Sequence, residues 1–497
     1  MIVMKFGGAS LSSPASMKRV VSLVRSERHR HPIVVVSALG DTTDHLVSIL
    51  GHACRAESYG GWKAQENLKN YHFSVAEDLL SGERLDSLHS WMRSAFRDLH
   101  VRTLEVCEGE RPLTPELRDW VLSLGEQLSS RIFTAVLEEH GIPALHQDAR
   151  QLILTDDRFT NAQPRQWETY ARLRWSVPLA ARDHVVVLGG FIGATEDGRT
   201  TTLGRGGSDL TASLVGAAVN AEEIQVWKDV DGLLTWDPKI KAGGYRVKRL
   251  SYEEAAELAG GGATILHPDT VAPAQRLHIP VVIRNTFRPE GEGTTISIQQ
   301  GKGSGVVKSI ACRTRVTLLE LQSPDNYVRW PEYSAQWEHL CQQGNMAGTL
   351  LGQSENTLYI ALETKTCVPE FALKLDGCVE VHLRTEQAIL TLVGEGIRQA
   401  GMTGRVRDLL ASSEALLLPG SSGSCALRVA VPDHSLVTYL DLFQRAFFTN
   451  LNSQYFAISS PADESRKHSQ ETRSMELSTA AVPLARPGLP LWPLPSR

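Results

Sequence analysis

The feature that most constrains the fold is an almost unbroken apolar run, H-P-I-V-V-V-S-A-L, over residues 31–39. A strand that is apolar at successive positions leaves no face for water, which is typical of a parallel sheet covered on both sides. The run ends in the polar turn G-D-T-T-D. The pattern therefore predicts a strand at the centre of an α/β domain.

Further short apolar runs alternate with stretches of helical periodicity. Strands are predicted at residues 1–6, 143–145, 184–188, 223–227 and 280–284. Helices are predicted at 17–24, 117–137 and 210–219, and the whole segment 51–140 is rich in Leu, Ala, Glu and Arg and should be mostly helical. Strands that alternate with helices predict a doubly wound, mostly parallel sheet whose strand ends form the site.

Beyond Val306 the pattern changes to short strands and helices. Strands are expected at 316–321, 356–362, 388–393, 416–418 and 426–431, and helices at 404–412 and 435–448. These elements fit two copies of a small β-α-β-β unit, the second ending in a helix, which would suit a pair of ligand-sensing modules. The predicted domains are the doubly wound α/β domain over 1–300 and α+β modules over 306–385 and 386–458. The proline-containing tail, 459–497, is predicted to be disordered and offers at most a weak polyproline ligand.

Composition excludes several classes of protein. The 497-residue chain has a net charge of −5, so nothing in its overall charge indicates nucleic-acid binding. Its seven cysteines are scattered and never spaced as C-x-x-C, which favours a reducing compartment and no structural zinc. Without a leader or a run of 18 apolar residues, we expect a cytoplasmic protein that does not enter a membrane.

Residues 200–209 read T-T-T-L-G-R-G-G-S-D and follow an apolar run. Glycines let backbone amides approach an anion, Arg205 supplies a cation and Asp209 a carboxylate. Ser208 and Asp209 are predicted to start a helix whose N-terminus would face the bound group. The alternative is a surface turn that happens to precede a helix.

Two other stretches have the composition of a phosphate site. Lys5 closes the first apolar run just before Gly7 and Gly8, where an ammonium group and free amides could hold phosphoryl oxygens. The acidic stretch 227–239, W-K-D-V-D-G-L-L-T-W-D-P-K, is interpreted as a nucleotide-facing loop or as a plain acidic loop. Its spacing does not fit an EF-hand, and the chain lacks the signatures of P-loop enzymes, protein kinases and dinucleotide-binding dehydrogenases.

Nine motifs in one order resemble aspartate kinases of the amino acid kinase superfamily. They are K-F-G-G-A-S, V-V-V-S-A-L-G-D-T-T-D, S-L-G-E-Q-L-S-S-R, T-D-D-R-F, G-G-F-I-G, L-G-R-G-G-S-D-L-T-A, W-K-D-V-D-G-L-L-T-W-D-P-K, L-S-Y-E-E-A-A-E-L and G-A-T-I-L-H-P. The resemblance covers residues 2–298, and the later part is similar to the paired ACT regulatory modules of that family. It implies transfer of the ATP γ-phosphoryl group to the side-chain carboxylate of L-aspartate, giving 4-phospho-L-aspartate for lysine, threonine and methionine synthesis.

The resemblance also implies roles for single residues. Lys5 would neutralise charge in the transition state, and Asp209 would orient Lys5 or the phosphates that carry Mg²⁺. The residues that would bind aspartate are Ser37, Thr43, Glu126 for the ammonium group and Arg205 for a carboxylate. The residues that would face ATP are Gly7, Gly8, Ser10, Lys228, Asp229 and Lys239.

The chain departs from the family's pattern most clearly at Thr264, where a lysine that looks nucleotide-directed is usual. Two alternatives therefore stay open. One is a related kinase that acts on another small acid, such as glutamate or acetylglutamate. The other is a weakly active subunit that senses amino acids through its C-terminal modules. In each case we expect a homo-oligomer, because open sheets need cover.

Overall fold

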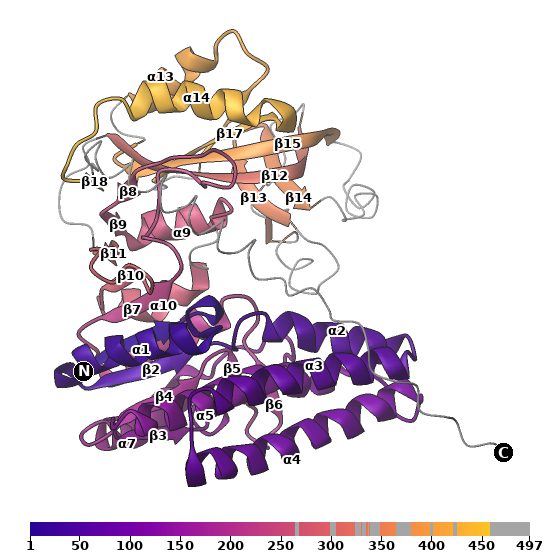
Figure 1. Cartoon of the computed structure of the whole chain (residues 1–497). Coiled ribbons are helices and arrows are strands. Elements are labelled where there is room, and N and C mark those ends of the chain that lie inside the picture. Colours follow the sequence, from indigo (N-terminus) through magenta and orange to yellow (C-terminus); the bar gives the residue numbers. More distant parts are fainter. Residues whose placement is uncertain are drawn as a thin grey trace, which may run out of the picture. The chain divides into compact units, whose positions relative to one another are not determined.

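The structure is a computed structural model, shown in Figure 1. It describes residues 1–263, 268–298, 305–323, 348–363, 379–397, 401–420 and 425–457, together with 330, 334, 335 and 337. Residues Met1–Phe456 pack as one unit. The predicted tail over 459–497 lies outside the described residues, and so do Thr264 and most of the segment 324–347.

An eight-stranded, mostly parallel sheet forms the first half, in the order β3-β4-β2-β1-β7-β10-β11-β9. Among the strands of this sheet, only β10 and β11 pair antiparallel. The strands of the sheet are β1 Ile2–Phe6, β2 Pro32–Val36, β3 Ala144–Gln147, β4 Val185–Gly189, β7 Ile224–Lys228, β9 Arg249–Ser251, β10 Val281–Asn285 and β11 Thr294–Ser297. The short strands beside it are β5 Ile192–Ala194, β6 Thr200–Thr202 and β8 Arg246–Val247.

Helices cover both faces of this sheet, as the apolar runs require. Along β2, Ile33 and Val35 face one core, whereas Val34 and Val36 face the other. Helices α7 and α8 contribute to the first core, and α1, α2 and α5 to the second. The helices are α1 Pro14–Ser26, α2 Thr42–Cys54, α3 Ser58–Glu77, α4 Gly82–Cys107, α5 Pro115–Glu139, α6 Ala149–Leu152, α7 Gln166–Ala180, α8 Gly207–Val219, α9 Tyr252–Gly260 and α10 Pro268–Arg276, with short 3₁₀ turns η1 Gly8–Leu11 and η2 Arg28–Arg30.

A six-stranded antiparallel sheet forms the second half, in the order β13-β14-β12-β15-β17-β16. Its elements are β12 Val306–Gln322, β13 Gly348–Gln353, β14 Thr357–Glu363, β15 Glu380–Glu395, α13 Met402–Leu410, β16 Leu416–Leu418, β17 Ala426–Pro432, η3 Asp433–Ser435 and α14 Leu436–Phe447, followed by β18 Phe456–Ala457. The long strands β12 and β15 pair along their whole length, from Val306 opposite Glu395 to Gln322 opposite Glu380. The predicted module boundary at 385/386 falls inside β15, so one sheet runs across it.

The predicted α/β fold class is confirmed, with a doubly wound sheet followed by α+β structure. One local prediction was wrong. Helix α8 begins at Gly207 after the left-handed Gly206, so Ser208 and Asp209 lie inside its first turn and do not cap it. Glycine adopts a positive φ of 74° with little steric strain because it has no Cβ, and this conformation lets the chain turn sharply into the helix.

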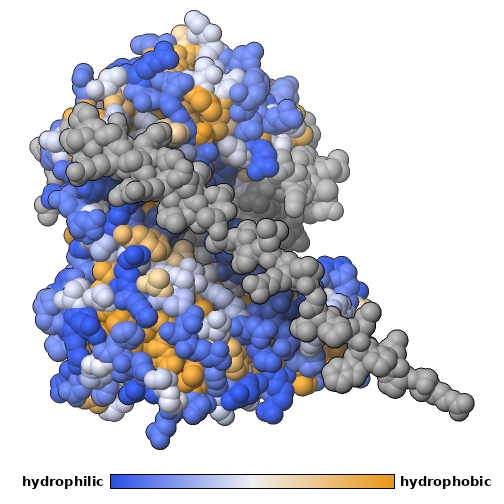
Figure 2. Space-filling view, in the orientation of Figure 1, coloured by the Kyte–Doolittle hydropathy of each residue, from blue (hydrophilic) through white to orange (hydrophobic). Residues whose placement is uncertain are grey.

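The surface carries both hydrophilic and hydrophobic residues (Figure 2). In Figure 2 hydrophilic residues cover much of the visible face, with hydrophobic patches among them. Within the described ranges, no helix combines the length and the apolar character that crossing a membrane requires.

Candidate active site

The strand order places the carboxyl ends of β4, β2, β1 and β7 side by side. Phe6 lies in register with Val36 on one side and with Trp227 on the other, so the residues after these strands meet at one edge. Ligands of open α/β sheets bind at such an edge. Of the residues predicted to be functional, several lie at or just after these strand ends: Lys5, Gly7, Gly8, Ser37, Lys228 and Asp229.

Asp209 lies between two lysines at this edge. Its Oδ1 is 2.7 Å from the Lys5 Nζ, and its Oδ2 is 3.6 Å from the Lys228 Nζ. Lys5 comes from β1, Lys228 ends β7 and Asp209 lies in the first turn of α8. Lys5 and Asp209 are less than a tenth exposed. Three elements distant in sequence thus build one buried ion cluster.

The charges of this cluster stabilise one another. Burial alone would raise the pKa of Asp209, but Lys5 and Lys228 outweigh burial and lower it. Burial lowers the pKa of Lys228, and the neighbouring Asp209 opposes that shift. Asp209 is therefore ionised at neutral pH, and it keeps two ammonium groups close together.

Glu126 is a buried carboxyl group on α5 that faces the same edge. Its Oε1 accepts a hydrogen bond of 3.2 Å from the Ala38 amide just beyond β2. Burial raises its pKa to about 8, an effect that the Ala38 hydrogen bond and the charge of Lys5 only partly offset. The carboxyl group is therefore largely protonated at pH 7, and a cation placed against it would convert it to the carboxylate.

Glycines allow the close packing of these elements. A Cβ on Gly8 would lie 2.8 Å from the Ala38 carbonyl oxygen, and one on Gly190 would lie 2.7 Å from the Ser208 Cβ. The Gly7 amide donates to the Trp227 carbonyl oxygen (3.2 Å) and so ties β1 to β7. The Ser10 Oγ is 2.7 Å from the Thr286 Oγ1 in a buried hydrogen bond.

The remaining residues predicted for the substrate lie around Glu126 and Asp209. Ser37 follows β2 and is half-buried, and Thr43 lies in the first turn of α2, also half-buried. Arg205 is exposed on the loop before α8. Among the described residues its guanidinium group makes no ion pair, so it is available to an anion from solution.

A cavity of about 340 Å³ adjoins the ion cluster at Lys228. Three predicted nucleotide residues line it: Lys228, Asp229 and Lys239. Its apolar lining residues include Val230, Leu233, Leu234 and Trp236. The cavity thus has charged residues beside the ion cluster and an apolar interior, which is the usual character of a small-molecule site.

The second half of the chain supplies one wall of this cavity. Residues 309–312 of β12 line it. The Ser309 Oγ donates to the Leu234 carbonyl oxygen (2.8 Å), and the Ile310 amide donates to that of Thr235 (2.8 Å). The sequence did not reveal this wall, because β12 belongs to the segment that was interpreted as regulatory.

Beside that wall, β12 is also anchored to α9 by charge. Lys308 is buried, and its Nζ lies 2.8 Å from the Glu254 Oε2 and 3.7 Å from the Glu395 Oε2. An ion pair also joins Arg428 of β17 to Glu257 of α9. The turn after α9 reaches the cavity through Gly262 and Ala263. Hydrogen bonds and ion pairs therefore connect the six-stranded sheet directly to the residues that line the cavity.

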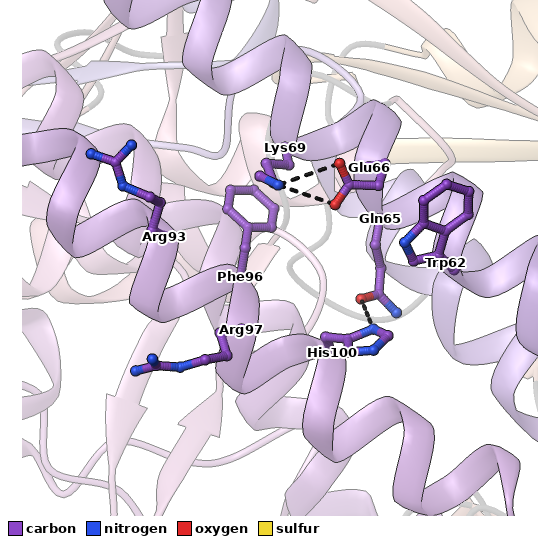
Figure 3. Close-up of a pocket in the computed structure, with 8 residues that line it drawn as sticks. All are labelled: Trp62, Gln65, Glu66, Lys69, Arg93, Phe96, Arg97 and His100. Carbon is purple, nitrogen blue, oxygen red and sulfur yellow. Dashed lines mark hydrogen bonds and ion pairs between the residues drawn. The ribbon is translucent and has the colours of Figure 1, made fainter.

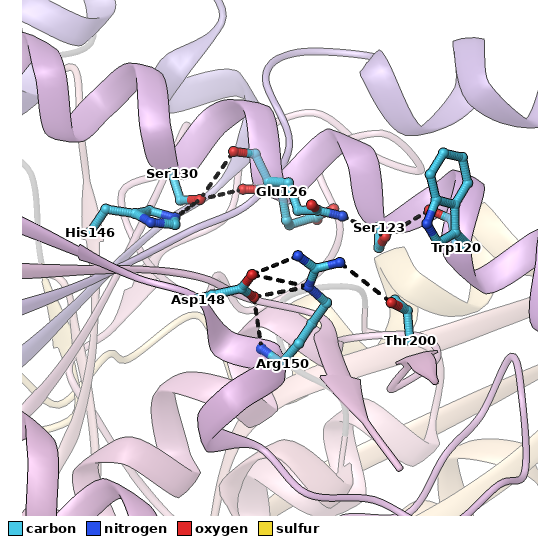
Figure 4. A network of polar contacts seen from close by, with 9 residues as sticks. Trp120, Ser123, Glu126, Ser130, His146, Asp148, Arg150 and Thr200 are labelled. Atoms are coloured by element: carbon cyan, nitrogen blue, oxygen red, sulfur yellow. Dashed lines mark hydrogen bonds and ion pairs between the residues drawn. The ribbon is translucent and has the colours of Figure 1, made fainter. Parts of the chain in front are cut away.

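A polar network supports the substrate side (Figure 4). The Ser130 Oγ donates to the Glu126 carbonyl oxygen (2.7 Å) and lies 3.1 Å from the His146 Nε2. Burial and then Arg131 lower the pKa of His146 to about 4, so the ring is neutral at pH 7. Asp148 and Arg150 form a separate bonded pair beside this network.

Asp119 is a structural residue that the sequence analysis did not select. Its Oδ2 accepts from the Thr160 and Thr202 amides at 2.8 Å each, and its Oδ1 from the Thr202 Oγ1 at 2.8 Å. It therefore fixes β6, from which the loop to Arg205 departs. The signal was an aspartate among the apolar positions of a helix, since a buried carboxylate is rare unless it is paired.

Residues 1–285 match the model of the amino acid kinase family. The chain is 36% identical over 333 residues to aspartokinase 2, chloroplastic, of Arabidopsis thaliana, covering 65% of this chain and 59% of the relative. It is 33% identical over 404 residues to the aspartokinase of Chlamydia trachomatis, covering 81% and 88%.

The fold agrees with E. coli aspartokinase III. The structure of that enzyme with aspartate and ADP superposes with a TM-score of 0.77 at 26% identity, covering 90% of this chain and 100% of the other. Its structure with lysine and aspartate gives a TM-score of 0.72 at 26% identity, covering 90% and 99%.

Replacing Asp209 tests the ion cluster without any ligand. Asp209→Asn leaves the buried ammonium group of Lys5 and the half-buried one of Lys228 without their carboxylate, so the free energy of unfolding should fall by about 3 kcal/mol at pH 7. Because the folded pKa is lowered, this stabilisation exists above the unfolded pKa of about 4 and fades as pH falls through the folded pKa. Chemical denaturation at pH 7 and below pH 4 measures it.

The exposed Asp197, paired with Arg199, provides the matched control. Asp197→Asn should change stability little at either pH. Equal losses in the two variants would contradict a special role for Asp209.

Proposed function

This chain belongs to the amino acid kinase family, as an aspartokinase, and we propose that it transfers the γ-phosphoryl group of ATP to the side-chain carboxylate of L-aspartate. The product would be 4-phospho-L-aspartate. The observation that carries the proposal is the cluster of Lys5, Asp209 and Lys228 between the cavity and the buried Glu126. A phosphoryl group bound there would have cations on one side and an amino acid on the other.

Catalysis would rest on positioning and charge. A carboxylate oxygen of aspartate attacks the γ-phosphorus, and the bond from that phosphorus to the oxygen shared with the β-phosphate breaks, which releases ADP. The acceptor is already ionised at neutral pH, so the chain needs no general base. Lys5 and Lys228 would stabilise charge on the transferring group, and Asp209 would hold both lysines in place before substrate arrives.

The amino acid would be held from two directions. Glu126 would receive the substrate ammonium group, with Ser37 and Thr43 lining the same pocket. Arg205 would clamp a carboxylate, for which the planar guanidinium group is suited. The exposure of Arg205 supports this role, because an exposed, unpaired cation can close on the substrate after entry.

The nucleotide would lie in the 340 Å³ cavity. The apolar lining residues Val230, Leu233 and Trp236 would contact the base of the nucleotide. The charged lining residues Lys228, Asp229 and Lys239 would lie near its ribose and phosphates. Gly8 and Ser10 begin the turn after β1 that would face the phosphates. The Gly7 amide is bonded to Trp227, so its support of the site would be structural.

Magnesium would enter with ATP and shield the phosphate charges. No group of three metal-ligating side chains occurs within the described ranges. We propose that the nucleotide supplies most of the ligands of this ion, as is common for Mg²⁺.

The six-stranded sheet is proposed to be regulatory. We propose that residues 306–385 and 386–458 form two ACT-like modules, with the long strand β15 running across their boundary. An amino acid is proposed as the effector, since the E. coli structure in its T-state contains lysine. We also propose a homo-oligomer and a cytoplasmic location, although the Arabidopsis relative is named chloroplastic.

A coupled ADP-release assay tests the proposed reaction. L-Aspartate should support turnover, whereas L-glutamate and N-acetyl-L-glutamate should not. Arg205→Ala should raise the KM for aspartate by about tenfold or more, which corresponds to ~1.4 kcal/mol of lost binding. Turnover with glutamate or acetylglutamate but not with aspartate would favour a related kinase that acts on that acid. No turnover with any of the three acids would favour a regulatory subunit that senses amino acids.

The raised pKa of Glu126 predicts how aspartate affinity depends on pH. Because the substrate ammonium group needs the carboxylate, the KM for aspartate should fall by about tenfold between pH 7 and pH 9, as a pKa of about 8 is crossed. Glu126→Gln should give a higher KM that no longer varies over this range. A parallel pH profile in both proteins would remove Glu126 from the ammonium site.

The cavity assignment is tested by filling it. Val230→Phe should raise the KM for ATP by about tenfold, ~1.4 kcal/mol, while the KM for aspartate stays the same. Val230→Ala is the matched comparison, since it enlarges the same cavity and should raise the KM for ATP much less than Val230→Phe does. An unaltered KM for ATP in Val230→Phe would move the nucleotide elsewhere.

A further inference from the structure

A second cavity lies between α3 and α4, apart from the strand ends. It holds about 220 Å³ and is lined by Trp62, Gln65, Glu66, Lys69, Arg93, Phe96, Arg97 and His100. Figure 3 shows Trp62 at one side and Arg93 and Arg97 at the other, with Phe96, Gln65 and His100 between them. None of these residues takes part in the proposed phosphoryl transfer.

Positive charge exceeds negative charge in this groove. Three cations, Lys69, Arg93 and Arg97, line it together with a single carboxylate, Glu66, which pairs with Lys69 at 3.1 Å. Arg97 donates only to the Ser94 Oγ (3.3 Å), and among the described residues neither arginine has a carboxylate partner. On a chain of net charge −5, two unpaired guanidinium groups beside one cavity form a local attraction for anions.

The groove also offers aromatic surface and a fixed polar base. Trp62 is 48% exposed, whereas Phe96 is buried. Gln65 is buried, and its Nε2 donates to the Thr103 Oγ1 (2.8 Å) while its Oε1 lies 3.3 Å from the His100 Nδ1. Since these hydrogen bonds hold the base of the groove, its shape is largely preformed.

We propose that this groove binds a small anion that carries a flat apolar ring. The guanidinium groups of Arg93 and Arg97 point outward in Figure 3, and these exposed side chains would turn inward to hold a phosphate or carboxylate group, for which they have the matching donors. The ring would stack on the exposed face of Trp62. A volume of 220 Å³ is below that of drug-sized pockets, so the ligand is a single-ring compound.

Phenyl phosphate is the probe, and the full chain is titrated by calorimetry. Inorganic phosphate supplies the anion without the ring, and benzyl alcohol supplies the ring without the anion. Phenyl phosphate should bind at least tenfold tighter than either. The double variant Arg93→Gln/Arg97→Gln should weaken it by tenfold or more, and Trp62→Leu should lower its affinity to that of inorganic phosphate.

Lys63→Gln is the matched control, because Lys63 is an exposed cation next to Trp62 that does not line the groove. It should leave the affinity unchanged. Equal weakening in Lys63→Gln and in the arginine variant would reduce the effect to general charge and overturn the site. So would binding that survives the arginine variant but is lost in the presence of ATP, since it would belong to the cavity beside Lys228. Equal affinity for all three probes would also overturn it.

Discussion

The candidate active site depends on one carboxylate, that of Asp209, which lies between the ammonium groups of Lys5 and Lys228. Lys5 and Lys228 end neighbouring parallel strands, and without Asp209 their charges would repel across a buried edge. Parallel pairing of β1 with β7 fixes the separation of the lysines, and the first turn of α8 fixes the aspartate. The fold therefore supplies concentrated positive charge before any substrate binds, which is the condition for electrostatic catalysis.

The rest of the structure can be understood as support for this edge. Glycines at positions 8 and 190 let the strand ends and α8 approach closely. Asp119 fixes the short strand that precedes Arg205. On the other side, β12 contributes a wall of the 340 Å³ cavity and a buried lysine bonded to α9. Any shift of the six-stranded sheet would act directly on that wall, which would give the proposed regulation a short physical route.

Much of the fold could be predicted from the sequence, whereas several features of the site could not. Six apolar runs identified the central strands to within a few residues, because strands buried on both faces have a distinctive pattern. Five of the six strands of the second sheet were also predicted, but β13 was missed, and so was the full length of β12 and β15. The unpredicted start of β15 is exposed and lacks an apolar pattern. The start of α8 was misplaced because a left-handed glycine, and not a side-chain cap, begins it. The wall formed by β12 and the pairing of Lys228 with Asp209 are tertiary contacts, which local patterns do not encode.

In the proposed reaction the buried charge of Lys5 acts on the transferring phosphoryl group. The most direct test is the kcat of Lys5→Met, which keeps the length of the side chain but removes its charge. We expect a loss of about a hundredfold or more in kcat, with little change in the KM for aspartate and with a folded protein. A kcat close to that of the parent chain would contradict it.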